Sequence, residues 1–85
     1  MKKYQLIDDG TVLNGIKLYQ IKALTSFGKI KAGEVGGYIE KESNLSQEGH
    51  CWVGKNAKIL GNVFVTNNAV VMTGTISSHY HIRIH

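Results

Sequence analysis

The most constraining feature of the sequence is a six-residue period between residues 51 and 76. A half-buried strand places apolar side chains at every second position, and the odd positions from 51 follow this rule two times out of three. The exceptions are Lys55, Gly61, Asn67 and Thr73. Two inward-facing residues followed by a polar residue or glycine describe a strand that is interrupted once in every period. The chain is therefore predicted to turn a corner every six residues.

The residues that follow these corners support this interpretation. Asn and Gly tolerate left-handed backbone angles better than other residues do. They follow the predicted corners at Asn56, Asn62, Asn68 and Gly74. We therefore expect the chain to change direction at these four positions.

The rest of the chain is also predicted to be all-β. The sequence has 10 glycines and no proline, and no helical pattern of apolar residues persists in it. Asn14-Gly15 lies between apolar runs and is the strongest short-range signal for a hairpin. The hairpin strands are expected near residues 11–13 and 16–24. The glycine-rich stretch over residues 28–49 is expected to form turns and short extended pieces.

Four segments of residues 53–76, "VGKNAK", "ILGNVF", "VTNNAV" and "VMTGTI", resemble consecutive hexapeptide repeats of the left-handed parallel β-helix family. In that family an aliphatic residue and, four positions later, a small residue face the interior. The resemblance assigns the aliphatic positions to Val53, Ile59, Val65 and Val71. It assigns the small positions to Cys51, Ala57, Val63, Ala69 and Thr75. Leu60 and Val63 are larger than the family pattern prefers, which implies a slightly irregular coil.

The upstream stretch "KAGEVGGYIEKESNLSQEGHCWV" resembles the N-terminal region of prophage-type bacterial proteins that continue into such repeats and are labelled as transferases. Three hexads form one triangular coil in that family, so four repeats give only a little more than one coil. Repeat architectures need stacked units and capped ends. The resemblance therefore implies one domain with three parts: a hairpin and capping region over residues 1–50, β-helix coils over residues 51–78 and a C-terminal strand over residues 79–85.

Outward-facing apolar residues predict self-association. Strand alternation points several large side chains away from the coil interior, and the amphipathic C-terminal strand has an edge that can pair with another chain. The residues expected at this interface are Trp52, Leu60, Phe64, Val70, Met72, Tyr80 and Ile82. We expect a homodimer or homotrimer. The alternative is that the N-terminal region folds over these side chains.

Candidate catalytic and metal-binding residues are few. His50 and Cys51 are adjacent, but neighbours on a strand point to opposite faces, so Cys51 is predicted to be a core residue. His79 and His81 share a strand face about 7 Å apart, whereas His85 lies about 13 Å beyond His81. A polar surface is therefore preferred to a metal site. No phosphate-binding loop is present.

Acyltransferases of the hexapeptide family place a catalytic histidine and a cofactor channel between neighbouring subunits. The four repeats contain no histidine and too few coils for such a channel. We therefore expect neither an enzyme nor a bound cofactor or metal. A remnant of such an acyltransferase is kept as an alternative.

The preferred functional interpretation is a non-catalytic protein-binding module. The prophage resemblance makes its concrete form a phage-encoded modulator of a bacterial host protein, for example an inhibitor of a defence system. A second alternative is nucleic-acid binding, because the whole net charge of +4 lies within residues 1–31. The basic residues expected to contact nucleic acid are Lys17, Lys22, Lys29 and Lys31.

The expected compartment is the cytoplasm, without a membrane partner. Cys51 is the single cysteine, and a lone cysteine without a secretory leader fits a reducing compartment. The sequence also lacks an apolar run of the roughly 18 residues that a membrane span requires.

Overall fold

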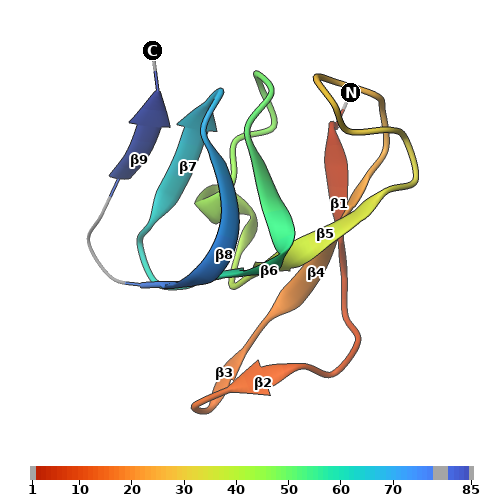
Figure 1. Cartoon of the computed structure of the whole chain (residues 1–85). Helices are drawn as coiled ribbons and strands as arrows, with labels where there is room; N and C mark the ends of the chain where they lie inside the picture. The colour runs from red at the N-terminus through yellow and green to blue at the C-terminus, as the bar shows by residue number, and fades with distance from the viewer. Residues whose placement is uncertain (1, 78–80, 85) are drawn as a thin grey trace.

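The computed structural model describes residues 2–77 and 81–84, and over these residues the chain is all-β, as expected (Figure 1). The strands are β1 (Tyr4–Ile7), β2 (Val12–Leu13), β3 (Ile16–Lys17), β4 (Tyr19–Ala23), β5 (Val35–Ile39), β6 (Trp52–Ile59), β7 (Phe64–Asn67), β8 (Val70–Ile76) and β9 (His81–Ile84). A single 3₁₀ turn, η1 (Glu42–Asn44), lies between β5 and β6.

The N-terminal strands pair in antiparallel fashion. β2 and β3 form the expected hairpin, with Asn14 at φ 50° and Gly15 at φ 81° in its turn. The strand expected over residues 16–24 is divided in two at Leu18, which is fully buried and donates its backbone N–H to the carbonyl of Thr11 at 3.0 Å. Beyond that residue, β4 turns away from the hairpin and pairs with β1 and β5.

The C-terminal strands pair in parallel fashion, at a nearly constant separation in the sequence. Residue 52 pairs with residue 70, eighteen positions later, and residue 57 pairs with residue 74. β7 and β9 are also parallel, with residue 64 opposite residue 81. The chain therefore returns to the same direction about every 17 or 18 residues, and successive passes stack side by side (Figure 1).

The corners of these passes are marked by left-handed backbone angles. Gly61 has φ 67°, Asn67 has φ 58° and Gly74 has φ 94°. The prediction for Gly74 is confirmed, whereas the predictions for Asn62 and Asn68 are wrong by one position. The reason is visible at the second corner, where the N–H of Ala69 donates to the carbonyl of Thr66 at 3.1 Å and makes Asn67 the first central residue of the turn. The prediction for Asn56 is also wrong: this residue lies within β6 without a left-handed angle, and the chain shows a register shift between Val53 and Asn56 instead.

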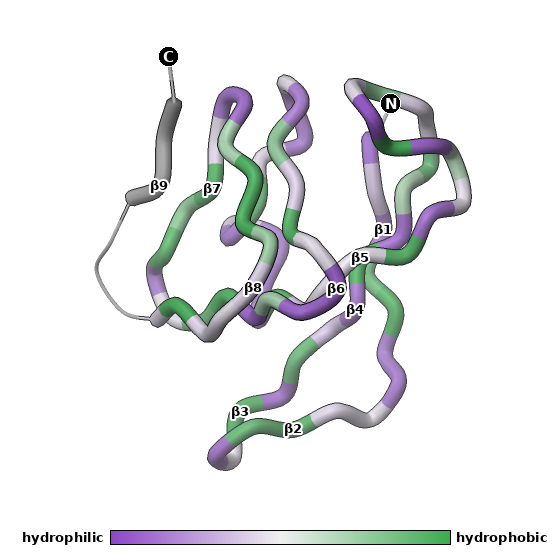
Figure 2. Tube along the Cα trace, in the orientation of Figure 1, coloured by the Kyte–Doolittle hydropathy of each residue, from purple (hydrophilic) through white to green (hydrophobic). Residues whose placement is uncertain are grey.

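One hydrophobic core joins the two parts of the chain. Figure 2 shows hydrophobic segments in both the N-terminal and the C-terminal strands. The inward positions predicted from the six-residue period are buried at Cys51, Val53, Ala57, Ile59, Val63, Val65, Ala69 and Val71. Thr75 is exposed instead. It lies on β8, the last strand of its sheet in the described part of the chain, so no further strand covers it.

Strand β5 lies against the bend of β6 with almost no space between the two backbones. A Cβ atom at Gly37 would lie 2.1 Å from the carbonyl oxygen of Gly54 and 2.4 Å from that of Ala57. A Cβ atom at Gly36 would lie 2.5 Å from the carbonyl oxygen of Val53. The pair of glycines in "EVGGYIE" therefore permits β5 to pack closely against β6.

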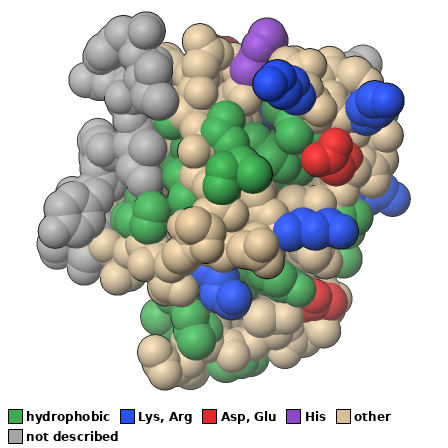
Figure 3. All heavy atoms as spheres, in the orientation of Figure 1, with side chains coloured by type: hydrophobic (Ala, Val, Ile, Leu, Met, Phe, Trp, Pro, Cys, Tyr) green, Lys and Arg blue, Asp and Glu red, His purple; other side chains and the backbone are tan. Residues whose placement is uncertain are grey.

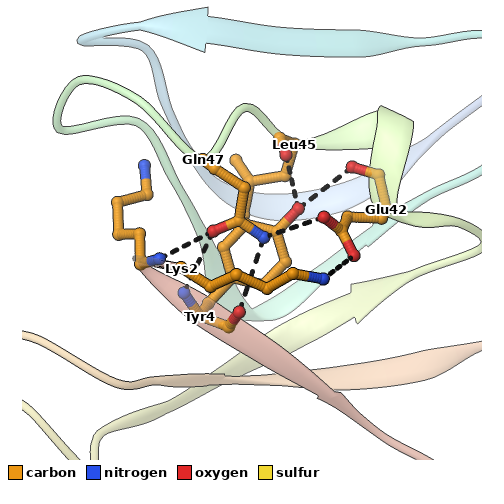
Figure 4. A network of polar contacts seen from close by, with 6 residues as sticks. Lys2, Tyr4, Glu42, Leu45 and Gln47 are labelled. Atoms are coloured by element: carbon orange, nitrogen blue, oxygen red, sulfur yellow. Dashed lines mark hydrogen bonds and ion pairs between the residues drawn. The ribbon is translucent and has the colours of Figure 1, made fainter.

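A network of hydrogen bonds fixes β1 to the start of the coils (Figure 4). The buried hydroxyl of Tyr4 contacts the backbone carbonyls of Glu42, at 3.0 Å, and of Leu45. The side-chain oxygen of Gln47 accepts the N–H groups of Lys3 at 2.7 Å and of Tyr4 at 3.2 Å. Burial, with a smaller contribution from nearby Glu42, raises the pKa of Tyr4, so the phenol stays neutral and can donate.

Asn44 connects η1 to the coils from a fully buried position. Its side-chain oxygen accepts the N–H groups of Glu40 at 3.1 Å and Lys41 at 2.8 Å. Its amide nitrogen donates to the carbonyls of Gly61 at 3.0 Å and Val63 at 2.8 Å. All four hydrogen bonds of this amide are therefore made, which offsets the cost of burying it.

Candidate functional site

A groove of about 970 Å³ lies between the β4–β5 loop and the outer side of β6 and β8. Its floor is formed by Trp52, Val70 and Met72. Ile30 and Val35 face this floor from the loop and from the start of β5. The groove therefore has apolar side chains on two sides and is the leading candidate for a functional site.

Trp52 is held in place by the N-terminal part of the chain. Its indole is only 2% exposed, and the ring of Phe27 packs edge-on against it at a centroid distance of 5.4 Å. A Cβ atom at Gly36 would lie 2.8 Å from the indole, so the glycine leaves room for the ring. The expectation that Trp52 is exposed is therefore wrong, because the β4–β5 loop folds over it.

Leu60 is buried as well, at 5% exposure, which also corrects the expectation. β6 ends at Ile59 and the chain turns at Gly61, so strand alternation no longer gives the direction of the Leu60 side chain. Phe64 is 38% exposed but lies outside the groove, beside Asn62 and Lys41.

Val70 and Met72 are exposed as expected, at 49% and 65%. They flank the inward-facing Val71 on β8, so both side chains point outward. Of the interface residues predicted, the structure thus brings Trp52, Val70 and Met72 together. Tyr80 and the side chain of Ile82 lie outside the described residues. Self-association through this face stays a prediction.

Charged side chains lie along one side of the apolar floor (Figure 3). Lys29 and Lys55 are exposed at the groove, and neither forms an ion pair with another described residue. His50 also lines the groove. The acidic side chain there is Glu34, one oxygen of which accepts the N–H of Lys31 at 3.2 Å. The groove therefore carries an excess of positive charge.

The lysines expected to bind nucleic acid do not form one patch. Lys17 lies on the β2–β3 hairpin, where its ammonium is 2.6 Å from a carboxylate oxygen of Asp8 and lowers the pKa of that carboxyl. Lys29 and Lys31 lie in the β4–β5 loop, at the opposite end of β4, and Lys22 lies between on that strand (Figure 1). Nucleic-acid binding stays a prediction without a common surface to support it.

Cys51 is fully buried, whereas its neighbour His50 is exposed, so the two do not form a nucleophile–base pair. The Cys51 sulfur is instead 3.4 Å from the ammonium of Lys3, which also donates to the carbonyls of Cys51 at 2.9 Å and Gly49 at 3.2 Å. Burial lowers the pKa of Lys3, and the nearby Cys51 opposes this effect.

The described ranges contain no cluster of three or more His, Cys, Asp or Glu side chains that could hold a metal ion. Two of the histidines considered from the sequence, His79 and His85, lie outside these ranges. Within the same ranges, no helix is long and apolar enough to cross a membrane.

No protein-family model matches the chain. The chain is similar to the protein named uncharacterized acetyltransferase YdcK from Escherichia coli (strain K12), with 38% identity over 85 aligned residues. The match covers 88% of this chain and 26% of the E. coli protein, so the chain spans about a quarter of the length of that relative. The similarity supports a relationship to a transferase family.

This similarity contradicts two expectations from the sequence. The chain was expected to be a non-catalytic protein-binding module, a phage-encoded modulator of a host protein, and not an enzyme. A relative named as an acetyltransferase favours the acyltransferase alternative instead. The four repeats lack a histidine and a cofactor channel, but they align with only a small part of the relative, since the match covers 26% of that protein.

Proposed function

We propose that this chain forms the N-terminal cap and the first coils of an acetyltransferase built on a left-handed parallel β-helix of hexapeptide repeats. The observation that carries this proposal is the 38% identity to a protein named as an acetyltransferase. Acetyl transfer is therefore the reaction proposed for the protein to which these coils belong.

The strand register supports the hexapeptide part of the proposal. Three hexads span eighteen residues. Residues 52 and 53 pair with residues 70 and 71 at that separation, and after a register shift residues 56–59 pair with residues 73–76 at a separation of seventeen. The aliphatic positions of the four repeats are buried. This is what a coil of three hexads per turn requires, because equivalent residues of successive coils must stack on one another.

The N-terminal strands support the capping part of the proposal. β5 pairs with β6 in parallel, whereas β4 and β1 continue the same sheet in antiparallel fashion. Ile21 and Ile39 from these strands are fully buried against the coils. At the other end, β8 is the last strand of this sheet in the described part of the chain, and a further coil could pair with it there.

The test is a chimera in which this chain replaces the aligned segment of the E. coli relative. The parent and the chimera are incubated with acetyl-coenzyme A that carries an isotope label in the acetyl group and with a bacterial metabolite extract. Labelled products are then counted by mass spectrometry. We expect the chimera to unfold in one cooperative transition and to transfer label at a rate comparable to that of the parent.

The matched control is the same chimera with Val65→Asp, which places a charge in the coil interior and should lose both folding and transfer. A chimera whose new segment unfolds separately would contradict the scaffold role. A parent protein that binds no acetyl-coenzyme A and transfers no label would contradict the proposed reaction.

A further inference from the structure

We propose that the groove between the β4–β5 loop and β8 binds a small anionic amphiphile, a molecule with an alkyl chain and a carboxylate head group. This binding site is separate from the proposed acetyl transfer and does not depend on it. Three properties of the groove carry the inference: its apolar walls, its unbalanced positive charge and its rigid floor.

The apolar walls fit an alkyl chain. Val70 and Met72 expose about half or more of their side chains, and they lie beside Trp52 in the same groove. Ile30 and Val35 line the groove from the opposite side. The volume of about 970 Å³ lies at the upper end of the range of small-molecule sites, which is about 300–1,000 Å³. An alkyl chain in the groove would remove these exposed apolar side chains from water.

The charge around the groove fits an anionic head group. Lys29 and Lys55 both line it without an ion-pair partner in the part of the chain that the structure describes. Glu34 is the one carboxylate among the lining residues, and it already accepts a backbone N–H. A carboxylate ligand could therefore pair with a lysine, whereas a cationic ligand would face two ammonium groups.

The floor of the groove is rigid and offers side chains rather than backbone groups. Phe27 and the absence of a side chain at Gly36 fix the position of Trp52, so a ligand would not have to order it. The backbones of β6 and β8 pair with each other beneath the groove. Between β6 and β8 a ligand would therefore meet side chains and not free backbone groups, which favours an alkyl chain over a peptide strand at this position; in the described part of the chain, the free edge of β8 lies on its other side, away from β6.

The single tryptophan of the chain provides the measurement, because Trp52 lies in the floor of the groove. Decanoate is titrated into the protein below its micelle concentration while Trp52 fluorescence is recorded. We expect a saturable change in emission. Decanol and decyltrimethylammonium serve as neutral and cationic probes with the same chain length, and both should bind about tenfold or more weakly.

Paired variants test the apolar walls and the positive charge of the groove separately. Val70→Ser with Met72→Ser should weaken decanoate binding by about tenfold or more, while Val12→Ser, at an exposed valine on the hairpin, should leave it unchanged. Lys29→Gln with Lys55→Gln should remove the preference for decanoate over decanol. Lys41→Gln, at an exposed lysine outside the groove, is the control.

Several outcomes would overturn the proposal. They are a titration without saturation, equal binding of decanoate and the cationic probe, and unchanged binding by the Val70 and Met72 variants. Acetate that competes with decanoate at equal concentration would show an anion site without a role for the apolar floor. Saturation by an acidic apolar peptide but not by decanoate would assign the groove to a protein partner. Circular dichroism of each variant checks that these surface substitutions leave the fold intact.

Discussion

At the scale of single residues, the glycines of β5 show how a short sequence pattern sets the position of a whole strand. Gly36 and Gly37 are buried between strands, in a segment that resembles a turn when only the sequence is considered. Their lack of side chains is required by contact with the β6 backbone rather than by left-handed angles. Composition alone does not distinguish a glycine that is needed for close contact between backbones from one that is needed for a left-handed angle, and only the close-contact use is compatible with a strand.

Gly37→Ala should destabilise the protein by about 2–3 kcal/mol, because the new methyl group would overlap two carbonyl oxygens of β6 that cannot move without breaking the sheet. Urea unfolding measures the change. Gly10→Ala is the matched control: its φ of 86° strains any side chain, at a cost of about 1 kcal/mol, but a Cβ atom there meets nothing within 4 Å. Equal losses for the two variants would show that β5 is not in close contact with β6.

At the scale of secondary-structure elements, the inward face of the coils and the β2–β3 hairpin each give a prediction. Val65 lies at an inward position of β7 and is fully buried. Val65→Asp would place an unpaired charge in the core, at a cost of several kcal/mol, and should prevent folding. Met72→Asp, at a 65% exposed position of β8, should fold normally. Circular dichroism of soluble protein distinguishes the two; a folded Val65→Asp variant would show that the six-residue period has been assigned to the wrong face.

Two carboxylates attach the hairpin to the rest of the chain. The ion pair with Lys17 lowers the pKa of Asp8, and a hydrogen bond from the Tyr38 hydroxyl at 2.6 Å lowers the pKa of Asp9. Because both pKa values are depressed by folding, their contribution is complete above the ordinary carboxyl pKa of about 4 and is lost as the pH falls through the lowered values. Both carboxylates are exposed to solvent, so their contribution to stability is modest and limited to the hairpin.

Amide hydrogen exchange of β2 and β3 should therefore be unchanged from neutral pH down to about pH 4, after correction for intrinsic exchange, and should accelerate below it. Exchange of β6 and β8 provides the internal reference, since no carboxylate holds those strands together. Loss of hairpin protection that begins near neutral pH would point to a titrating group other than Asp8 and Asp9.

At the scale of the whole molecule, the sequence predicts local structure better than long-range packing. The six-residue period identifies the buried positions of the coils, and Asn14-Gly15 identifies the hairpin, because both signals are local. The burial of Trp52 under Phe27 and the fully bonded amide of Asn44 join segments far apart in the chain, and no local pattern encodes either contact. The groove depends on the first of these contacts: Trp52, Val70 and Met72 were predicted to share an outward face, whereas the folding of the N-terminal region over Trp52 was kept only as an alternative.

The functional class could not be predicted from the repeats alone. Inward-facing valines and alanines specify a scaffold, and a scaffold is compatible with enzymes and with binding proteins alike. The similarity to a protein named as an acetyltransferase, and not the strand pattern, favours the enzyme alternative. The parallel register nevertheless has to be correct for both the proposed scaffold and the groove, because both depend on the pairing of β6 with β8, whose paired residues lie 17 or 18 positions apart.

The register is measured most directly by nuclear Overhauser contacts between backbone protons in an isotope-labelled sample. Parallel coils predict contacts between β6 and β8 that join residues 17 or 18 positions apart, including Val53 with Val71 and Ala57 with Gly74. An ordinary antiparallel meander would instead give contacts between Ile59 and Phe64 on either side of the turn at Gly61. Observation of the first set supports the stacked coils, and observation of the second set in its place would contradict them.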